Sequence, residues 1–144
     1  MDLSELLRKR LVERVEPDVK TAESLLKTAD DNLVAAEDNL KTGHADWALA
    51  IAYNAMLSSG RAFLAFKGYR ATSESHHYAV VSFCSALMPG DCGALINAFN
   101  RYRVRRHDVV YGESGSVGED EAKRVITSAR EFVGKTKALC RKNK

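Results

Sequence analysis

The residues with the clearest chemical potential lie in one basic stretch between positions 101 and 107. Four arginines fall within six positions and a histidine follows at once: Arg101, Arg103, Arg105, Arg106 and His107. Arginine can bind phosphate oxygens through two parallel hydrogen bonds, and histidine can accept or donate a proton near neutral pH. Such a run of like charge on a helix is unfavourable unless water or an anion neutralises it. The stretch is therefore either a solvated basic face or a site for an anion such as phosphate.

Composition places the chain among ordinary globular proteins. It has 144 residues, of which 45% are hydrophobic and 28% charged, enough for a single domain with its own core. The net charge of +3 is too small to predict nucleic-acid binding, so only the local cluster matters. The three cysteines (Cys84, Cys92, Cys140) form no Cys-x-x-Cys pair, which favours reduced thiols in a cytoplasmic protein. The histidines lack metal-ligand spacing and no apolar run approaches about 18 residues, so we expect no metal, no cofactor and no membrane span.

Apolar residues recur with the helical period along most of the chain, and no stretch alternates as a strand would. We predict an all-α fold: a single domain over residues 1–144, built as an up-and-down bundle of four to five long helices. An accessory N-terminal helix is expected over residues 1–16, with its apolar stripe ending at Pro17. Further helices are expected at about 18–42, 47–67, 76–88, 92–111 and 119–140, and residues 136–144 form the helix end and a basic tail.

Capping residues set the expected helix boundaries. Gly43 and Gly68 are placed to end the second and third helices, since glycine tolerates the left-handed conformation of a helix C-terminus. Asp46 and Asp91 are predicted N-caps of the helices that follow them. Val110 is expected to face inward near the end of the helix that carries the basic stretch.

The segment from Trp47 to Phe66 is predicted to be the central, most buried helix. It holds one charge, Arg61, in twenty residues, and an all-round apolar helix is a buried one. Ser58, Ser59 and Gly60 would let neighbouring helices approach closely. Arg61 must be paired or reach the surface, and it is either a structural ion-pair partner or part of the functional site. The adjacent histidines at positions 76 and 77 are assigned to capping and packing.

Three motifs in sequence order resemble the HEPN (higher eukaryotes and prokaryotes nucleotide-binding) domains of prokaryotes. Residues 43–56 read Gly-His-Ala-Asp-Trp-Ala-Leu-Ala-Ile-Ala-Tyr-Asn-Ala-Met, and residues 61–70 read Arg-Ala-Phe-Leu-Ala-Phe-Lys-Gly-Tyr-Arg. After the basic stretch, residues 121–132 read Glu-Ala-x-x-x-Ile-x-x-Ala-x-Glu-Phe. The resemblance covers about residues 18–135.

The resemblance implies a homodimerising bundle and, in many members, a metal-independent ribonuclease built on an arginine, four to six residues, and a histidine. Arg101 and His107 enclose five residues, so they are the implied catalytic pair, although Arg103 is an alternative partner for His107. Arg105 and Arg106, with Arg103, are the implied phosphate-binding residues. The supporting residues are Tyr111, Asp108 and Arg61.

Two functions follow from the resemblance. One is a toxin-like ribonuclease that a nucleotidyltransferase antitoxin holds silent. The other is a catalytically inactive adaptor that dimerises and binds a nucleotide, RNA or a nucleotidyltransferase partner. The second is kept because Tyr102 stands where the family usually has a polar residue after the arginine, and because Tyr111 lies four rather than two residues after His107.

Overall fold

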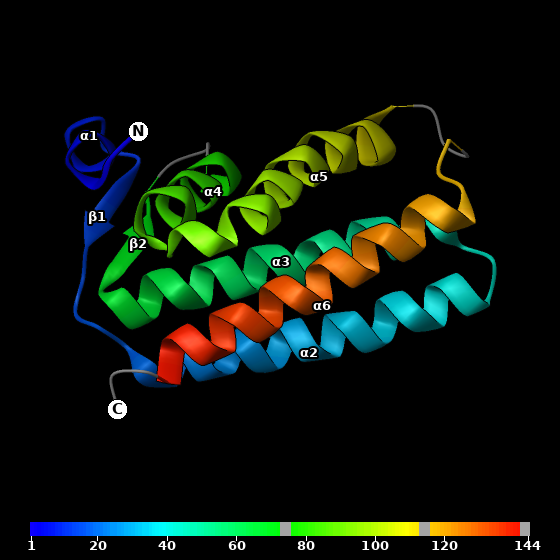
Figure 1. Ribbon diagram of the computed structural model, residues 1–144, viewed down its shortest axis with the longest axis horizontal. Helices are drawn as coiled ribbons and strands as arrows, with labels where there is room; N and C mark the ends of the chain where they lie inside the picture. Colours follow the sequence, from blue (N-terminus) through cyan, green and yellow to red (C-terminus); the bar gives the residue numbers. More distant parts are fainter. Residues whose placement is uncertain (73–75, 113–115, 142–144) are drawn as a thin grey trace.

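Long helices make up most of the chain in the computed structural model, which describes residues 1–72, 76–112 and 116–141 (Figure 1). The described residues form six helices, one 3-10 turn and two short strands. The helices are α1 (Leu3–Arg8), α2 (Val19–Lys41), α3 (Ala45–Lys67), α4 (His76–Leu87), α5 (Gly93–Tyr111) and α6 (Glu119–Arg141). The all-α class is confirmed, as are the approximate positions of the helices from α2 onward.

The helices form two layers that share α3. Figure 1 shows α2, α3 and α6 running side by side, with α4 and α5 covering the other side of α3. The long helices α2 and α3 run in opposite directions and are joined by a short turn, as an up-and-down bundle requires. This arrangement brings the start of α4 and the first half of α5 against the same helix.

Helix α3 is the buried centre of the bundle, as predicted. Fourteen of its residues are buried, because almost every face of this helix meets another helix. Trp47, in its first turn, is an exception with 58% of its surface exposed. Arg61 reaches the surface. The predicted close approach of neighbouring helices is found at Gly60. A Cβ added there would lie 2.6 Å from Cγ1 of Val80 on α4 and 3.3 Å from Cε2 of Phe99 on α5.

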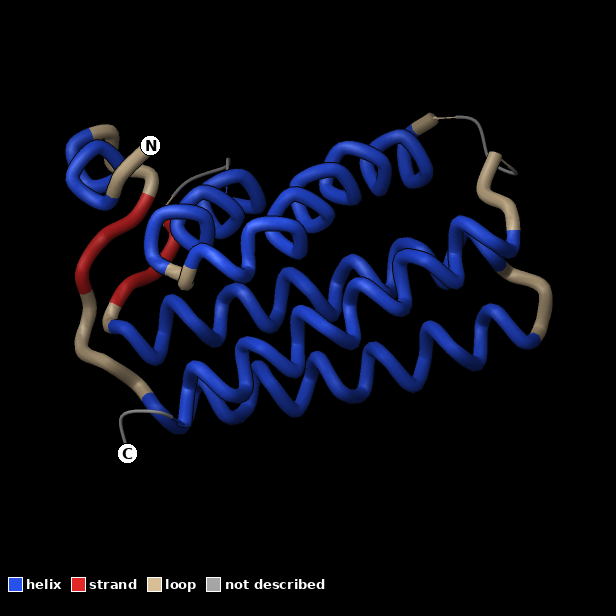
Figure 2. The backbone as a smooth tube through the Cα atoms, viewed as in Figure 1, coloured by secondary structure: helices blue, strands red, loops and turns tan. Residues whose placement is uncertain are grey.

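The N-terminal segment differs from the predicted single helix over residues 1–16. Helix α1 ends at Arg8, and Val12–Arg14 form strand β1, which pairs antiparallel with β2 (Tyr69–Ala71) in the register Glu13 opposite Arg70. Figure 2 shows the two strands side by side at one end of the bundle. The pairing depends on the turn at Gly68 (φ 91°), whose carbonyl accepts the N–H of Val15 at 2.9 Å. Strands of three residues are too short to show an alternation of apolar and polar residues in the sequence. Their extended form therefore depends on the pairing between β1 and β2.

Several predicted boundary residues are corrected by the structure. Gly43 and Gly68 end α2 and α3 with positive φ, as expected. Asp46 is not an N-cap: α3 begins one residue earlier and Asp46 lies in its first turn. Asp91 is not one either, because it belongs to the 3-10 turn η1 (Gly90–Cys92). Val110 is 41% exposed rather than buried, since the last turn of α5 extends beyond the helices that cover its start.

Other sequence-based expectations concern the loops and the thiols. The middle of the glycine-rich loop after α5 and the basic tail after Arg141 lie outside the described residues. Cys84, Cys92 and Cys140 are buried free thiols. Within the described ranges no helix combines the length and apolar character that crossing a bilayer demands.

Candidate functional site

Helix α5 positions the basic stretch by burying one side of its length. Phe99 and Tyr102 are buried against the bundle, and this fixes which arginines point outward. Because successive residues on a helix turn by about 100°, the arginines leave α5 in several directions. They therefore have different surroundings and do not form one continuous face.

A surface hollow between α4 and α5, here called the α4–α5 hollow, gathers much of the predicted site. Its volume is about 600 Å³. The lining residues are His77, Arg103, Val104, Arg106, His107, Asp108 and Tyr111. Two of the predicted phosphate-binding arginines thus share this hollow with the predicted catalytic histidine.

The arginines of the hollow are not neutralised by carboxylates. In the described part of the chain, neither Arg103 nor Arg106 has an ion-pair partner within 4.0 Å. The Nε of Arg103 donates to Oδ1 of Asn100 at 3.1 Å, and its guanidinium lies 5.5 Å from the ring centre of Tyr78. The Nε of Arg106 is buried without a hydrogen-bond partner among the described residues. That Nε is not accessible to a ligand, so an anion in the hollow would bind Arg106 through the terminal nitrogens of its guanidinium, which have no carboxylate partner among the described residues.

His107 lies on the exposed side of the hollow. Its ring centre is 4.9 Å from that of Tyr111, one turn further along α5. A spacing of four positions places the two side chains on the same face of the helix, so Tyr111 contacts His107. Asp108 lines the same hollow and supplies its acidic group.

Arg105 has a different environment from its neighbours. Its Nε and Nη2 donate to the two carboxylate oxygens of Glu121 on α6, both at 2.9 Å, and Nη2 also donates to the carbonyl of Ser116 at 3.0 Å. These bonds raise the pKa of Arg105 and lower that of Glu121. The two-pronged ion pair ties the middle of α5 to the first turn of α6. Arg105 therefore has a structural role and does not line the α4–α5 hollow.

Two other predicted residues also lie outside the hollow. The exposed guanidinium of Arg101 is 5.1 Å from the ring centre of its neighbour Tyr102. Arg61, on α3, lines a separate hollow of about 200 Å³ that also holds Arg70 and His76. The structure thus brings Arg103, rather than Arg101, to the hollow that holds His107.

A tyrosine–histidine pair at the inner wall of the hollow was not predicted from the sequence. Oη of Tyr53, a residue of α3 with no exposed surface, lies 2.9 Å from Nδ1 of His77 in the first turn of α4. Burial lowers the pKa of His77 to about 4, and the charges of His76, Arg106, Arg103 and Arg61 contribute to this shift. Burial raises the pKa of Tyr53. The adjacent histidines were a visible signal, but their partner lies 24 positions away and only the fold reveals it.

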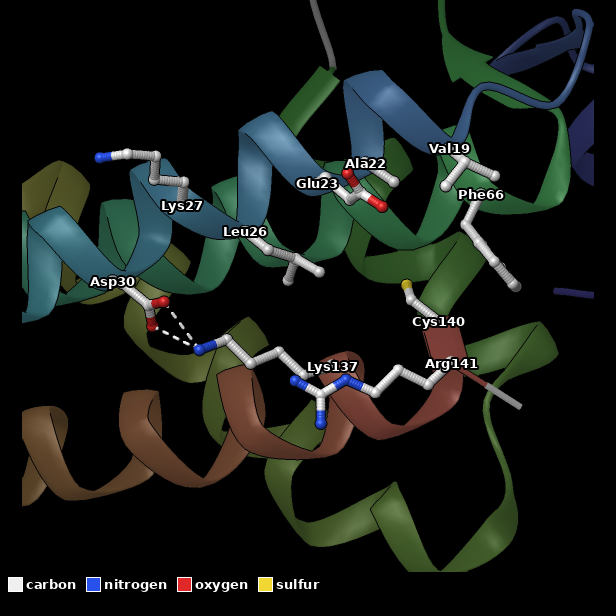
Figure 3. A pocket seen from close by; sticks show the side chains of 10 residues that line it. All are labelled: Val19, Ala22, Glu23, Leu26, Lys27, Asp30, Phe66, Lys137, Cys140 and Arg141. Atoms are coloured by element: carbon white, nitrogen blue, oxygen red, sulfur yellow. Dashed lines mark hydrogen bonds and ion pairs between the residues drawn. The ribbon is translucent and has the colours of Figure 1, made fainter. Parts of the chain in front are cut away.

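A second hollow, lined by residues of α2, α3 and α6, is a weaker candidate (Figure 3). It has a volume of about 350 Å³ and an apolar floor that includes Leu26 and Phe66. Its best-defined polar contact joins two helices, because Nζ of Lys137 on α6 donates to both carboxylate oxygens of Asp30 on α2 at 2.7 and 2.8 Å. Burial raises the pKa of its thiol, Cys140, to about 11, which makes that cysteine a poor nucleophile.

The described residues contain no group of three or more histidine, cysteine, aspartate or glutamate side chains arranged to hold a metal ion. Two unneutralised arginines can bind a phosphate, and His107 can transfer a proton beside it.

Comparisons with known proteins agree with this architecture. The family model described as HEPN domain matches residues 22–139. Among solved structures, the chain is similar to the crystal structure of TT1696 from Thermus thermophilus, with 18% identity and a TM-score of 0.64 over 81% of this chain and 96% of that chain. At this identity the likeness shows the fold alone. No curated protein matches the chain.

Proposed function

The chain belongs to the HEPN domain family, and we propose that it is a metal-independent endoribonuclease that uses the α4–α5 hollow. The observation that carries this proposal is the meeting of His107 with Arg103 and Arg106, two arginines without a carboxylate partner among the described residues. In the cell it would act as a toxin-like protein paired with a nucleotidyltransferase antitoxin.

The proposed reaction begins with a phosphodiester held by Arg106 and Arg103. The 2′-hydroxyl of the RNA attacks the adjacent phosphorus, and its proton passes to a base as the new P–O bond forms. The bond from phosphorus to the 5′-oxygen then breaks, and the leaving oxygen takes a proton from an acid. The products are a 2′,3′-cyclic phosphate and a free 5′-hydroxyl. His107 serves in proton transfer, and the arginines stabilise the charge that develops on the phosphorane.

A two-fold dimer would supply the second proton-transfer group by placing two copies of His107 across one cleft. The surface around His107 favours self-association: Val104, Val110 and Tyr111 on the same part of α5 are 51%, 41% and 70% exposed. Apolar side chains exposed together along one helix end are typical of a surface that is covered in an assembly. Such a dimer would bury on the order of 1,600 Å².

One observation favours the second candidate, the inactive adaptor. The arginine that fits the family spacing, Arg101, does not reach the hollow that holds His107 within one protomer. A hollow with two free arginines and no correctly placed catalytic arginine would bind RNA or a nucleotide without cleaving it. Because Arg101 is exposed and does not line the hollow of its own protomer, it could act on a ligand there only from across a dimer interface.

The test is cleavage of single-stranded RNA in the presence of EDTA. His107→Ala should reduce the cleavage rate by roughly 10²–10⁴-fold with little change in affinity, because a proton-transfer group acts on rate. Arg106→Ala should weaken binding and reduce the salt slope of the binding constant by about one. Arg101→Ala should cost less than Arg106→Ala. Arg130→Ala on α6 controls for the loss of one positive charge outside the hollow.

The outcomes separate the two candidates. Cleavage that is absent, that requires a metal, or that persists in the His107 variant contradicts the ribonuclease proposal, and binding without cleavage supports the adaptor. Sedimentation at micromolar concentration should show a species heavier than the 15.9 kDa protomer. Co-expression with a neighbouring nucleotidyltransferase should relieve any growth arrest that the chain causes alone.

A further inference from the structure

The Tyr53–His77 pair has a defined proton arrangement. Tyr53 has no exposed surface, and the only hydrogen-bond partner of its Oη among the described residues is Nδ1 of His77 at 2.9 Å. If Nδ1 carried the ring proton, the buried tyrosine proton would have no acceptor, which is costly in the protein interior. The hydroxyl of Tyr53 therefore donates to Nδ1. In a neutral imidazole the single ring proton is then on Nε2.

The protonated nitrogen faces the site. His77 lines the α4–α5 hollow together with Arg103 and Arg106, while its Nδ1 side is turned toward the interior. Nε2 has no partner in the described part of the chain, and it is not among the buried atoms that lack one. It is thus an accessible donor beside two arginines that lack carboxylate partners.

From this geometry we propose that His77 is a neutral hydrogen-bond donor to a phosphate oxygen of the RNA backbone, with its tautomer fixed by Tyr53. The inference rests on the proposed RNA-binding function of the hollow. His77 contacts the ligand, and Tyr53 is a positioning residue that acts through it. This role differs from that of His107, which transfers protons.

The surroundings keep His77 neutral. The charged or titratable groups that face it are His76 on its own helix, Arg103 and Arg106 on α5, and Tyr53 and Arg61 on α3. Burial, followed by the charges of His76 and the three arginines, lowers the pKa of His77 to about 4. At neutral pH a third positive charge beside the two arginines is therefore avoided, and the donated hydrogen bond does not vary with pH. A proton-transfer role would instead require His77 to change its charge in the range of the assay.

The experiment compares His77→Ala with His77→Gln, whose side-chain amide offers an N–H close to the position of Nε2. Affinity is measured with a 2′-O-methyl oligonucleotide, which cannot be cleaved, and cleavage is measured with the matching RNA between about pH 6 and about pH 8. His77→Ala should weaken both by about tenfold at every pH, the usual effect of one hydrogen bond to a charged group. His77→Gln should recover most of the loss. Tyr53→Phe keeps the aromatic ring but removes the hydroxyl that fixes the tautomer of His77. Its affinity and cleavage rate should lie between those of the wild type and of His77→Ala.

The tautomer is read independently of RNA by ¹⁵N NMR of the histidine rings, with an unprotonated Nδ1 and a protonated Nε2 expected for His77. A proton on Nδ1 overturns the inference, as does an unchanged affinity in His77→Ala. The inference is also overturned if His77→Gln cleaves RNA as slowly as His77→Ala and both lose one limb of the pH profile of cleavage. That result would make His77 a proton donor or acceptor. If the oligonucleotide binds and depends on His77 but no RNA is cleaved, the ribonuclease proposal fails and this inference stands.

Discussion

Helices α3, α4 and α5 approach one another closely at Gly60, and the substitution Gly60→Ala tests whether that packing is tight. The residue lies in the middle of α3, and its surroundings are the side chains of α4 and α5. An added Cβ would lie 2.6 Å from Cγ1 of Val80, 3.3 Å from Cε2 of Phe99 and 3.5 Å from Sγ of Cys84. Val80 and Phe99 have no exposed surface, so neither can move outward freely.

The magnitude follows from two opposed effects. Alanine favours a helix interior over glycine by about 1 kcal/mol. Against this, Cγ1 of Val80 must retreat by roughly 1 Å to restore a normal carbon–carbon contact, and overpacking of this kind costs about 1–3 kcal/mol. The net expectation is a loss of about 1 kcal/mol in the free energy of unfolding.

A matched control isolates the packing effect. Gly134 lies in the middle of α6, and an added Cβ there would meet no atom within 4 Å. Gly134→Ala should stabilise the protein by up to about 1 kcal/mol, because it gains helix propensity without a clash. The difference between the two variants is then the packing term alone. Urea denaturation followed by circular dichroism gives both values from midpoints at equal slope. If Gly60→Ala is as stabilising as Gly134→Ala, the close contact among α3, α4 and α5 is wrong.

Two further predictions concern stability. Glu121→Gln should lower the free energy of unfolding by about 1 kcal/mol, because it weakens the partly exposed ion pair with Arg105; an unchanged urea midpoint would contradict the structural role of that pair. Lowering the pH from about 6.5 toward about 4 should destabilise the wild type, because the unfolded state binds a proton at His77 that the folded state does not. His77→Gln should reduce this dependence without abolishing it, because burial also lowers the pKa of His76. The loss linked to Glu121 begins only below its ordinary pKa. An equal dependence in both proteins would refute the assigned pKa of His77.

The helical core was predictable because its signals are local. Helix α3 contains a single charge in the stretch from Trp47 to Phe66, and α6 repeats apolar residues every three or four positions after an acidic first turn. Gly43 and Gly68 end their helices with positive φ, which few other residues adopt. The segment around β1 was missed because its extended form depends on β2, more than fifty positions away in the sequence. Leu11 and Val15 continue the apolar spacing of α1, so a local pattern extended the helix too far.

The candidate site was predictable only in part, for a similar reason. Placing Arg103, Arg106 and His107 near one another follows from helix geometry, since they lie three and four positions apart or adjacent. Helix geometry does not predict that Arg105 is separated from this group. Arg105 is held away by its ion pair with Glu121, which lies beyond a loop on another helix. The contribution of His77 was hidden as well. A buried tyrosine hydroxyl must find a partner, but only the packing of α3 against α4 shows which one it finds.

The two interpretations of the basic stretch, a solvated face and an anion site, therefore apply to different residues of the same helix. Arg101 is exposed beside the ring of Tyr102, and Arg105 is neutralised by Glu121. Neither needs a ligand to be stable where it lies. Arg106 differs, since its Nε is buried and unpartnered among the described residues, and His77 in the same hollow is kept neutral. Repulsion along α5 is thus relieved at every arginine except those that line the α4–α5 hollow, which is where an anion gains most by binding.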